Sequence, residues 1–262
     1  MERQEHGTCD KCGSPVLLAD AAGRKMEALS PVAMAMLGRG RRHKAQRDPG
    51  AIIEQITMQG YPSFEPIVHF QIRYGGVEYL AADEGGFYFD LFMPNLEFGE
   101  DRCSTEQDDN GIWYYELGTP RVAQIYYKMR QDGVVCSGGD EGMVPIASSV
   151  EKYIENDAVG DEMRAIQLCW WQVPLGAIQR DDRRLDAIVA VGHSVIERAS
   201  DDYTTWWEDD NSRIRRGVAH DAGPNWHMVH AYFQTREVAS SFVDVVRDVI
   251  AGPFDIYRFA LE

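Results

Sequence analysis

The sequence predicts an α+β protein, and three observations support this fold class. Apolar residues recur with helical spacing between residues 52 and 72, and aromatic and β-branched runs typical of strands follow them. A further helical pattern begins near residue 150. This order of two helices, several strands and one helix is typical of α+β domains. We expect three segments, an N-terminal extension over residues 1–50, a first domain over 51–160 and a second α+β domain over 161–262.

The N-terminal extension has a composition of its own. Its residues 39–47 form a basic run that ends at Asp48-Pro49-Gly50, a turn or linker signal, so we interpret it as an exposed connector. The charged start, Met1 to His6, is not followed by an apolar segment, which predicts no signal peptide and a cytoplasmic location. No apolar run approaches the roughly 20 residues that cross a bilayer, so we expect no membrane partner.

The elements of the first domain follow in order. Ile52, Ile53 and Ile56 form one helical stripe, and Gly60-Tyr-Pro62 ends it. Ser63 is the expected cap of a second helix that ends at Gly75-Gly76. Gly85-Gly86 then turns between two strands. The predicted strands are 77–80, 87–93, 113–117, 122–127 and 134–136, and a helix follows with Val150, Tyr153 and Ile154 on one face.

Residues 50–160 resemble the SUKH superfamily, best known as immunity proteins of bacterial polymorphic toxin systems. The resemblance rests on the ordered segments "AIIEQI", "GYPSFEPIVHFQIRYGG", "GGFYFDLF", "WYYELG", "VAQIYYK" and "IASSVEKYIEN". It implies a central antiparallel or mixed sheet flanked by helices and a role in binding and neutralising a toxin. It carries over no catalytic or binding residue.

The second domain is expected after a boundary near residues 156–162. A strand at 168–173, a helix at 185–199 and a strand at 226–233 are predicted, followed by a helix capped by Thr235 and a last strand at 254–259. The expected apolar face of the last helix holds Val238, Phe242, Val245, Val246 and Val249. The strand–helix–strand order resembles half of a ferredoxin-like domain.

Charge suggests the class of partner. The first 50 residues hold nine Lys and Arg against six Asp and Glu, so the residues after them carry −19 while the whole chain carries −16. Such a surface repels nucleic acid and favours a basic protein partner.

Two acidic segments are the candidate partner-binding surface, and the second also offers aromatic anchors. Their residues are Glu97, Glu100, Asp101, Asp108 and Asp109 in the first segment, and Asp201, Asp202, Trp206, Trp207, Glu208, Asp209 and Asp210 in the second.

Cys9-x-x-Cys12 is half of a possible zinc site, because thiolates at this spacing can bind one tetrahedral ion. His6, His43, or Cys103 together with Cys136 could complete it. A metal-free pair is the alternative, and otherwise no cofactor is expected. Five scattered cysteines do not form a disulfide framework, and reduced thiols are expected.

The sequence contains no Walker loop, no Gly-x-Ser-x-Gly elbow and no His-Glu-x-x-His motif. The leading hypothesis is a non-enzymatic immunity protein, an antitoxin that neutralises a basic toxin such as a nuclease. One alternative is a metal-dependent enzyme with its site in the C-terminal domain, where His220-Asp221 is the candidate pair. The other is a regulatory binding module whose N-terminus is stapled by zinc.

Overall fold

The computed structural model describes residues 28–80, 87–95, 100–120, 126–139, 142–167, 171–218 and 225–250, together with two short strands at the N-terminus. Within these residues the protein is mixed α+β, with antiparallel sheets and helices on their faces, as the sequence predicts. None of the described helices has both the length and the apolar character that crossing a bilayer requires.

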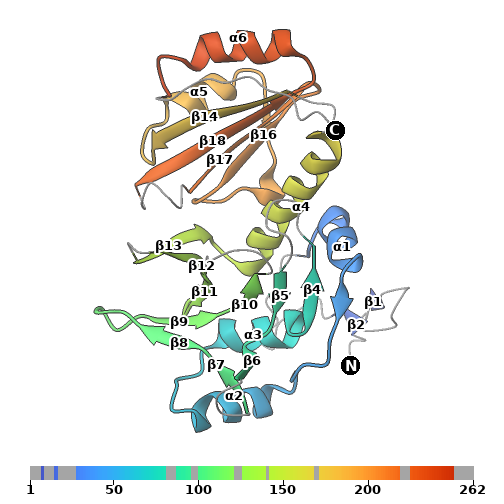
Figure 1. Ribbon diagram of the computed structural model, residues 1–262, viewed down its shortest axis with the longest axis vertical. Coiled ribbons are helices and arrows are strands. Elements are labelled where there is room, and N and C mark those ends of the chain that lie inside the picture. Colours follow the sequence, from blue (N-terminus) through green and yellow to red (C-terminus); the bar gives the residue numbers. More distant parts are fainter. Residues whose placement is uncertain are drawn as a thin grey trace, which may run out of the picture.

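Two bodies are stacked along the long axis, and the helix α4 runs between them (Figure 1). We call residues 28–149 the N-terminal half and residues 171–250 the C-terminal half. The helices are α1 (Pro31–Gly38), α2 (Pro49–Met58), α3 (Glu65–Tyr74), α4 (Val150–Gln167), α5 (Arg184–Val189) and α6 (Arg236–Val246), with a 3-10 turn η1 (Glu197–Ala199).

The N-terminal half contains a four-stranded sheet in the order β10-β5-β4-β3 and a five-stranded sheet in the order β13-β12-β11-β9-β8. The first consists of β3 (Arg41–Arg42), β4 (Val77–Tyr79), β5 (Phe87–Phe89) and β10 (Gly118–Pro120). The second consists of β8 (Thr105–Gln107), β9 (Trp113–Glu116), β11 (Tyr126–Arg130), β12 (Val135–Gly139) and β13 (Gly142–Ala147). Two hairpins complete the set, β1 (Gly7–Thr8) with β2 (Pro15–Val16), and β6 (Phe92–Asn95) with β7 (Glu100–Cys103).

One aromatic-rich core fills the N-terminal half. The rings of Phe87, Phe89 and Tyr127 contact Tyr153 of α4, with centroid distances of 5.6–6.5 Å. Val150, Tyr153 and Ile154 are all buried, which confirms their predicted common face. Edge-to-face and tilted aromatic contacts add stability beyond the area that they bury.

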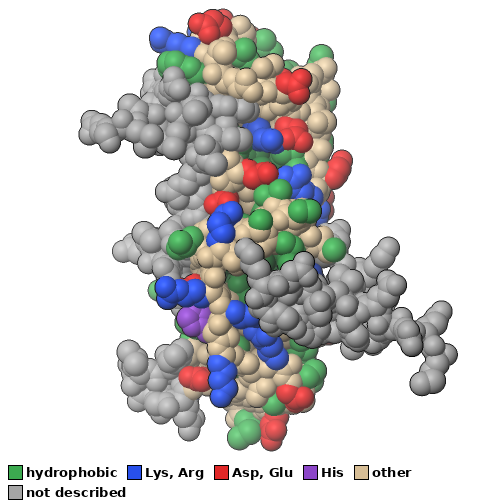
Figure 2. Space-filling model, turned by 90° about the vertical axis from the view of Figure 1, so that its right-hand side faces the viewer, with side chains coloured by type: hydrophobic (Ala, Val, Ile, Leu, Met, Phe, Trp, Pro, Cys, Tyr) green, Lys and Arg blue, Asp and Glu red, His purple; other side chains and the backbone are tan. Residues whose placement is uncertain are grey.

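The prediction of a separate N-terminal extension is wrong for residues 31–50. Ala33 and Met36 of α1 are fully buried in the same core, and β3 pairs with β4. Asp48 is not a linker residue, because it caps α2 by accepting a hydrogen bond from the Ala51 backbone N–H at 2.8 Å. Between these elements Arg39, Arg41, Arg42 and Lys44 are exposed as predicted. Figure 2 shows Lys and Arg side chains gathered in the lower part of the face that holds α1 and β3.

Several local expectations hold and others fail. The helices α2 and α3 and the strands β4, β5 and β9 lie where the sequence predicts them. Ser63 is not the cap of α3: the helix begins after Phe64 without a side-chain cap, and Pro66 provides the helix-compatible φ in its first turn. Gly75 has negative φ, and it is Gly76, at φ +79°, that needs glycine after the helix. Gly85 and Gly86 lie outside the described residues.

The C-terminal half is one antiparallel sheet in the order β14-β18-β17-β16-β15. Its strands are β14 (Trp171–Gln179), β15 (Ser194–Val195), β16 (Thr205–Glu208), β17 (Ser212–Val218) and β18 (Trp226–Phe233). One face packs on α5 and α6 through Ile214, Val229 and Val243, and the other packs on α4 through Met163, Trp206 and Tyr232. The sheet is therefore covered on both faces (Figure 1).

The predicted helix at 185–199 is wrong. The helix α5 ends at Val189, Ser194 and Val195 pair with β16, and η1 follows. The predicted boundary at 156–162 lies inside α4, which packs against both halves. Thr235 caps α6 as predicted, by accepting from the Val238 N–H. Of the predicted apolar face, Val246 is buried and Phe242 and Val249 pack against the core, whereas Val238 and Val245 are exposed. The strand expected at 254–259 lies outside the described residues.

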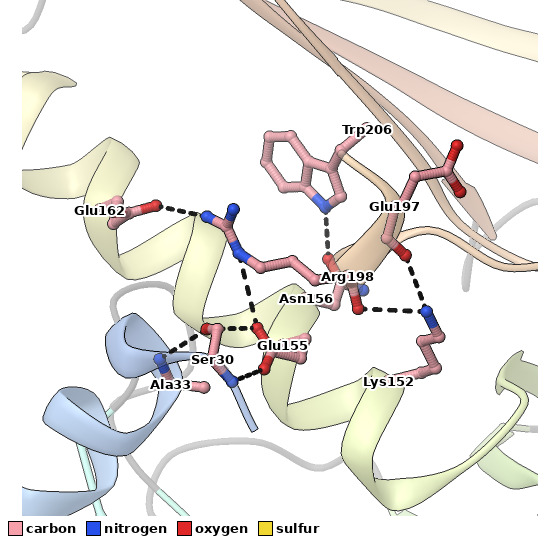
Figure 3. Close-up of polar contacts among 9 residues, drawn as sticks. All are labelled: Ser30, Ala33, Lys152, Glu155, Asn156, Glu162, Glu197, Arg198 and Trp206. Carbon is pink, nitrogen blue, oxygen red and sulfur yellow. Dashed lines mark hydrogen bonds and ion pairs between the residues drawn. The ribbon is translucent and has the colours of Figure 1, made fainter. Parts of the chain in front are cut away.

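A polar junction fixes the two halves to α4 (Figure 3). The buried Glu155 accepts hydrogen bonds from the backbone N–H and the hydroxyl of Ser30, and Arg198 lies 3.6 Å from the same carboxylate. The next residue along the helix, Asn156, accepts from the Trp206 indole N–H at 2.7 Å. The Lys152 ammonium donates to the Glu197 and Arg198 carbonyls. Successive residues of α4 thus bind the start of α1, η1 and β16 at once.

Candidate functional site

A cavity of about 500 Å³ opens on the N-terminal half between α3, the turn from β11 to β12, and the start of α4. Its lining includes six titratable side chains: Glu65, His69, Tyr74, Asp132, Glu151 and Lys152. We call this cavity the acidic cavity, because three carboxylates face one ammonium there. We take it as a candidate site for a ligand or a partner side chain.

Local structure explains why these residues meet. Glu65 and His69 are four residues apart on α3 and therefore lie on the same side of that helix. Gly133 forms the turn between β11 and β12 with φ +97°, and a Cβ there would lie 3.3 Å from Pro66 Cβ. Glycine thus lets the turn approach α3 closely, and this approach brings Asp132 to the cavity.

Glu151 is held in the cavity wall by two donors. Its Oε1 accepts from Arg73 Nη1 at 3.0 Å and from the Tyr74 hydroxyl at 2.9 Å. Burial, followed by the charge of Glu151, raises the pKa of Tyr74 well above its usual value, so the phenol stays protonated and remains a donor.

Asp132 is a fixed negative charge at the rim. Arg130 holds it through two hydrogen bonds of 2.8 and 2.7 Å, and these bonds lower the pKa of the Asp132 carboxyl. Lys152 is the one lysine of the lining, and its ammonium group donates hydrogen bonds to backbone carbonyls of η1. The cavity is therefore suited to a cationic group such as the side chain of a lysine or arginine.

The acidic residues that the sequence singles out do not form one surface. Asp101, Asp108 and Asp109 lie on β7 and on the hairpin between β8 and β9 in the N-terminal half, whereas residues 201–210 lie in the C-terminal half. Glu100 lies on β7, and Glu97 lies outside the described residues.

The carboxylates of three of these acids accept hydrogen bonds from backbone N–H groups in turns. Asp108 accepts from the N–H groups of Asn110 and Ile112, and Asp201 accepts from Tyr203 and Thr204. Asp209 accepts from the Asn211 N–H. Aspartate commonly stabilises turns in this way. Asp201 also reaches the rim of the acidic cavity, because its second oxygen accepts from the Ser148 N–H at 2.6 Å.

Other members of the second segment have different places. Glu208 forms an ion pair with Arg213 across the β16–β17 hairpin, and Asp202 and Asp210 are exposed. Trp206 and Trp207 are only 2% and 3% exposed, so they are not surface anchors. They lie in strand β16 on opposite faces of the sheet and pack into separate cores.

The predicted zinc ligands Cys9 and Cys12 lie outside the described residues, as does the pair His220-Asp221. Cys103 and Cys136 are buried thiols, and burial raises the pKa of each to about 12. His43 instead contacts Glu78, with Nε2 2.7 Å from Oε2. Within the described residues no three His, Cys, Asp or Glu side chains are grouped to hold a metal ion.

Sequence reasoning missed Glu65, Asp132 and Glu151 as a set. Each residue lies on a different element, and only the fold brings them together. The local signals are modest: the helical spacing of Glu65 and His69, and Asp132-Gly133 as a turn. Comparison of the chain with protein-family models, with curated proteins and with solved structures finds no match.

Proposed function

We propose that this protein is a cytoplasmic immunity protein that binds and neutralises a basic protein toxin, and that the acidic cavity receives a lysine or arginine side chain of that toxin. In this proposal the N-terminal half has a SUKH-like fold and the C-terminal half is a ferredoxin-like variant. The observation that carries the proposal is the acidic cavity itself, where Asp132 and Glu151 are held as acceptors and Lys152 is bonded elsewhere.

The overall charge supports this partner class. The chain carries −16, so a basic partner is attracted from a distance before it makes contact. A cationic side chain that enters the cavity loses much of its hydration and gains carboxylate partners in return. Exposed acids such as Asp109 and Asp202 would speed the encounter, whereas the cavity would slow dissociation.

The test uses the toxin domain encoded beside the gene of this protein. We expect a complex and loss of the toxin's activity. Asp132→Asn combined with Glu65→Gln should weaken the complex roughly 10-fold or more, mainly through faster dissociation, because each change removes one carboxylate from the cavity. Affinity and dissociation rate are measured by surface binding kinetics at two salt concentrations.

The matched control is Asp244→Asn on α6, whose side chain is 74% exposed and which makes the same type of charge change far along the chain. It should alter affinity less than about twofold. Equal effects of the cavity and control variants would place the binding surface elsewhere. Absence of both binding and neutralisation would reject the proposed function as a whole.

A further inference from the structure

Two almost fully buried side chains of the C-terminal half have nitrogen atoms without hydrogen-bond partners. Arg216 is 1% exposed and His227 is 4% exposed. Arg216 Nε and both ring nitrogens of His227 have no partner among the described residues. Buried polar atoms are nearly always paired in folded proteins, so such atoms in adjacent positions call for an explanation.

The register of the sheet places the two side chains together. Arg216 is opposite Val229, and His227 is opposite Val218, so Arg216 and His227 are diagonal neighbours on the β17–β18 hairpin. Because successive side chains alternate, both point to the face that is covered by α5 and α6. We call this pair, with Asp186 of α5, the Arg216–His227 cluster.

The arginine is fixed by its two terminal nitrogens. Nη1 donates to both carboxylate oxygens of Asp186, at 2.7 and 2.8 Å, and Nη2 donates to the Arg180 carbonyl. Nε is the one guanidinium nitrogen without a partner among the described residues, and it is held in place by the contacts of the other two.

The surroundings carry excess positive charge. Burial, followed by the charges of Arg216, Arg180 and Arg183, lowers the pKa of His227 to about 4, while Asp186 opposes them. Three guanidinium groups therefore act on the imidazole against one carboxylate, which leaves a local charge of about +2.

The cluster is connected to solvent through α5. Arg183 forms an ion pair with Asp186 at 3.0 Å, and their side chains are 70% and 25% exposed. The same carboxylate that binds the exposed Arg183 also binds the buried Arg216. Asp186 thus joins a side chain at the surface to a buried one.

We propose that the Arg216–His227 cluster is an anion site that takes a small oxyanion, with a phosphate dianion as the best match for the excess charge. Arg216 Nε–H and one N–H of His227 would donate to its oxygens, and the charges of Arg180 and Arg183 would favour its entry. An anion beside the imidazole favours the imidazolium, so binding raises the pKa of His227. The site does not depend on the proposed toxin binding.

His230 offers an internal control on the same strand. It lies on the opposite face, directly across from Arg215, and its pKa is lowered to about 4 by burial and by Arg215. The Arg215 guanidinium carbon is 5.9 Å from the centroid of the Trp206 ring. Arg215 thus lies against an aromatic ring, whereas Arg216 is paired with the carboxylate of Asp186.

The test follows the histidine resonances of the intact protein by NMR during titration with inorganic phosphate, with chloride added to a matched ionic strength in a parallel sample. We expect phosphate to shift the His227 signal with saturation and to raise the apparent pKa of His227 by about one unit or more, with His230 unchanged. Acetate in a third sample distinguishes a carboxylate ligand from phosphate.

Two variants sharpen the result. Arg183→Gln changes an exposed side chain and should weaken phosphate binding about 3- to 10-fold without loss of the fold. His230→Gln should leave phosphate binding unchanged. The proposal is overturned if phosphate and chloride act alike on His227, or if His227 and His230 respond equally.

Discussion

The acidic cavity and the Arg216–His227 cluster hold charge in opposite ways. In the cavity, Asp132 and Glu151 are partly exposed, and each is held by an arginine beside it. In the cluster, Arg216 is almost fully buried, depends on one carboxylate, and lies next to a histidine without partners among the described residues. Partly exposed ion pairs contribute little to the stability of the fold, whereas buried charges make the fold sensitive to the loss of a single group.

The largest expected effect is that of Asp186→Ala, which leaves the buried Arg216 without its counter-ion. We expect a loss of about 3–5 kcal/mol in the free energy of unfolding, because an uncompensated buried charge is costly. Urea denaturation followed by tryptophan fluorescence measures it. Asp182→Ala is the matched control, because Asp182 pairs with the largely exposed Arg184 and should cost less than about 1 kcal/mol. Similar losses for the two variants would remove the contrast between buried and surface charge.

The second prediction concerns acid stability. The pKa of His227 is about 4 in the folded protein, below the ordinary value of 6.5 that applies to the unfolded chain. The unfolded chain therefore binds a proton first, so the contribution of neutral His227 is complete above pH 6.5 and is lost as the pH falls towards 4. The loss should reach about 2–3 kcal/mol.

Denaturation at a series of pH values checks this expectation. His230 has a lowered pKa as well, so the wild-type curve should show the uptake of two protons between pH 6.5 and 4. His227→Gln and His230→Gln should each remove about half of the pH dependence. A curve that keeps its full slope in His227→Gln would contradict the buried neutral imidazole.

The two regions also differ in how far the sequence predicts them. Strand 226–233 and the Thr235 cap are predicted correctly, because alternation and capping are local properties. The predicted helix at 185–199 is wrong. Val189 and Ile196 continue an apolar spacing, but Gly192 follows the end of α5 and residues 194–195 pair with β16, the next strand along the chain. Tertiary pairing has overridden the local pattern there.

The candidate sites were harder to predict than the elements. Acidic residues such as Asp108 and Asp201 stand out in the sequence, but the backbone turns use their oxygens. Glu65, Asp132 and Glu151 come from three separate elements, and Arg216 and His227 meet only through the register of a hairpin. No spacing in the sequence encodes either set, so the fold must be known before they can be recognised.

The smallest expected effect tests the wall of the acidic cavity. Tyr74→Phe removes the hydroxyl that donates to Glu151 at 2.9 Å and keeps the aromatic ring in the core. Glu151 retains Arg73 as a partner at 3.0 Å, so no charge is left unpaired. We therefore expect a loss of only about 1 kcal/mol, the usual value for one hydrogen bond to a group that stays satisfied. Tyr126→Phe, at a position that is 61% exposed, should change stability by less than about 0.5 kcal/mol. If Tyr74→Phe instead costs as much as Asp186→Ala, Glu151 is as dependent on one partner as Arg216 is, and the cavity wall belongs with the buried cluster rather than with the exposed charges.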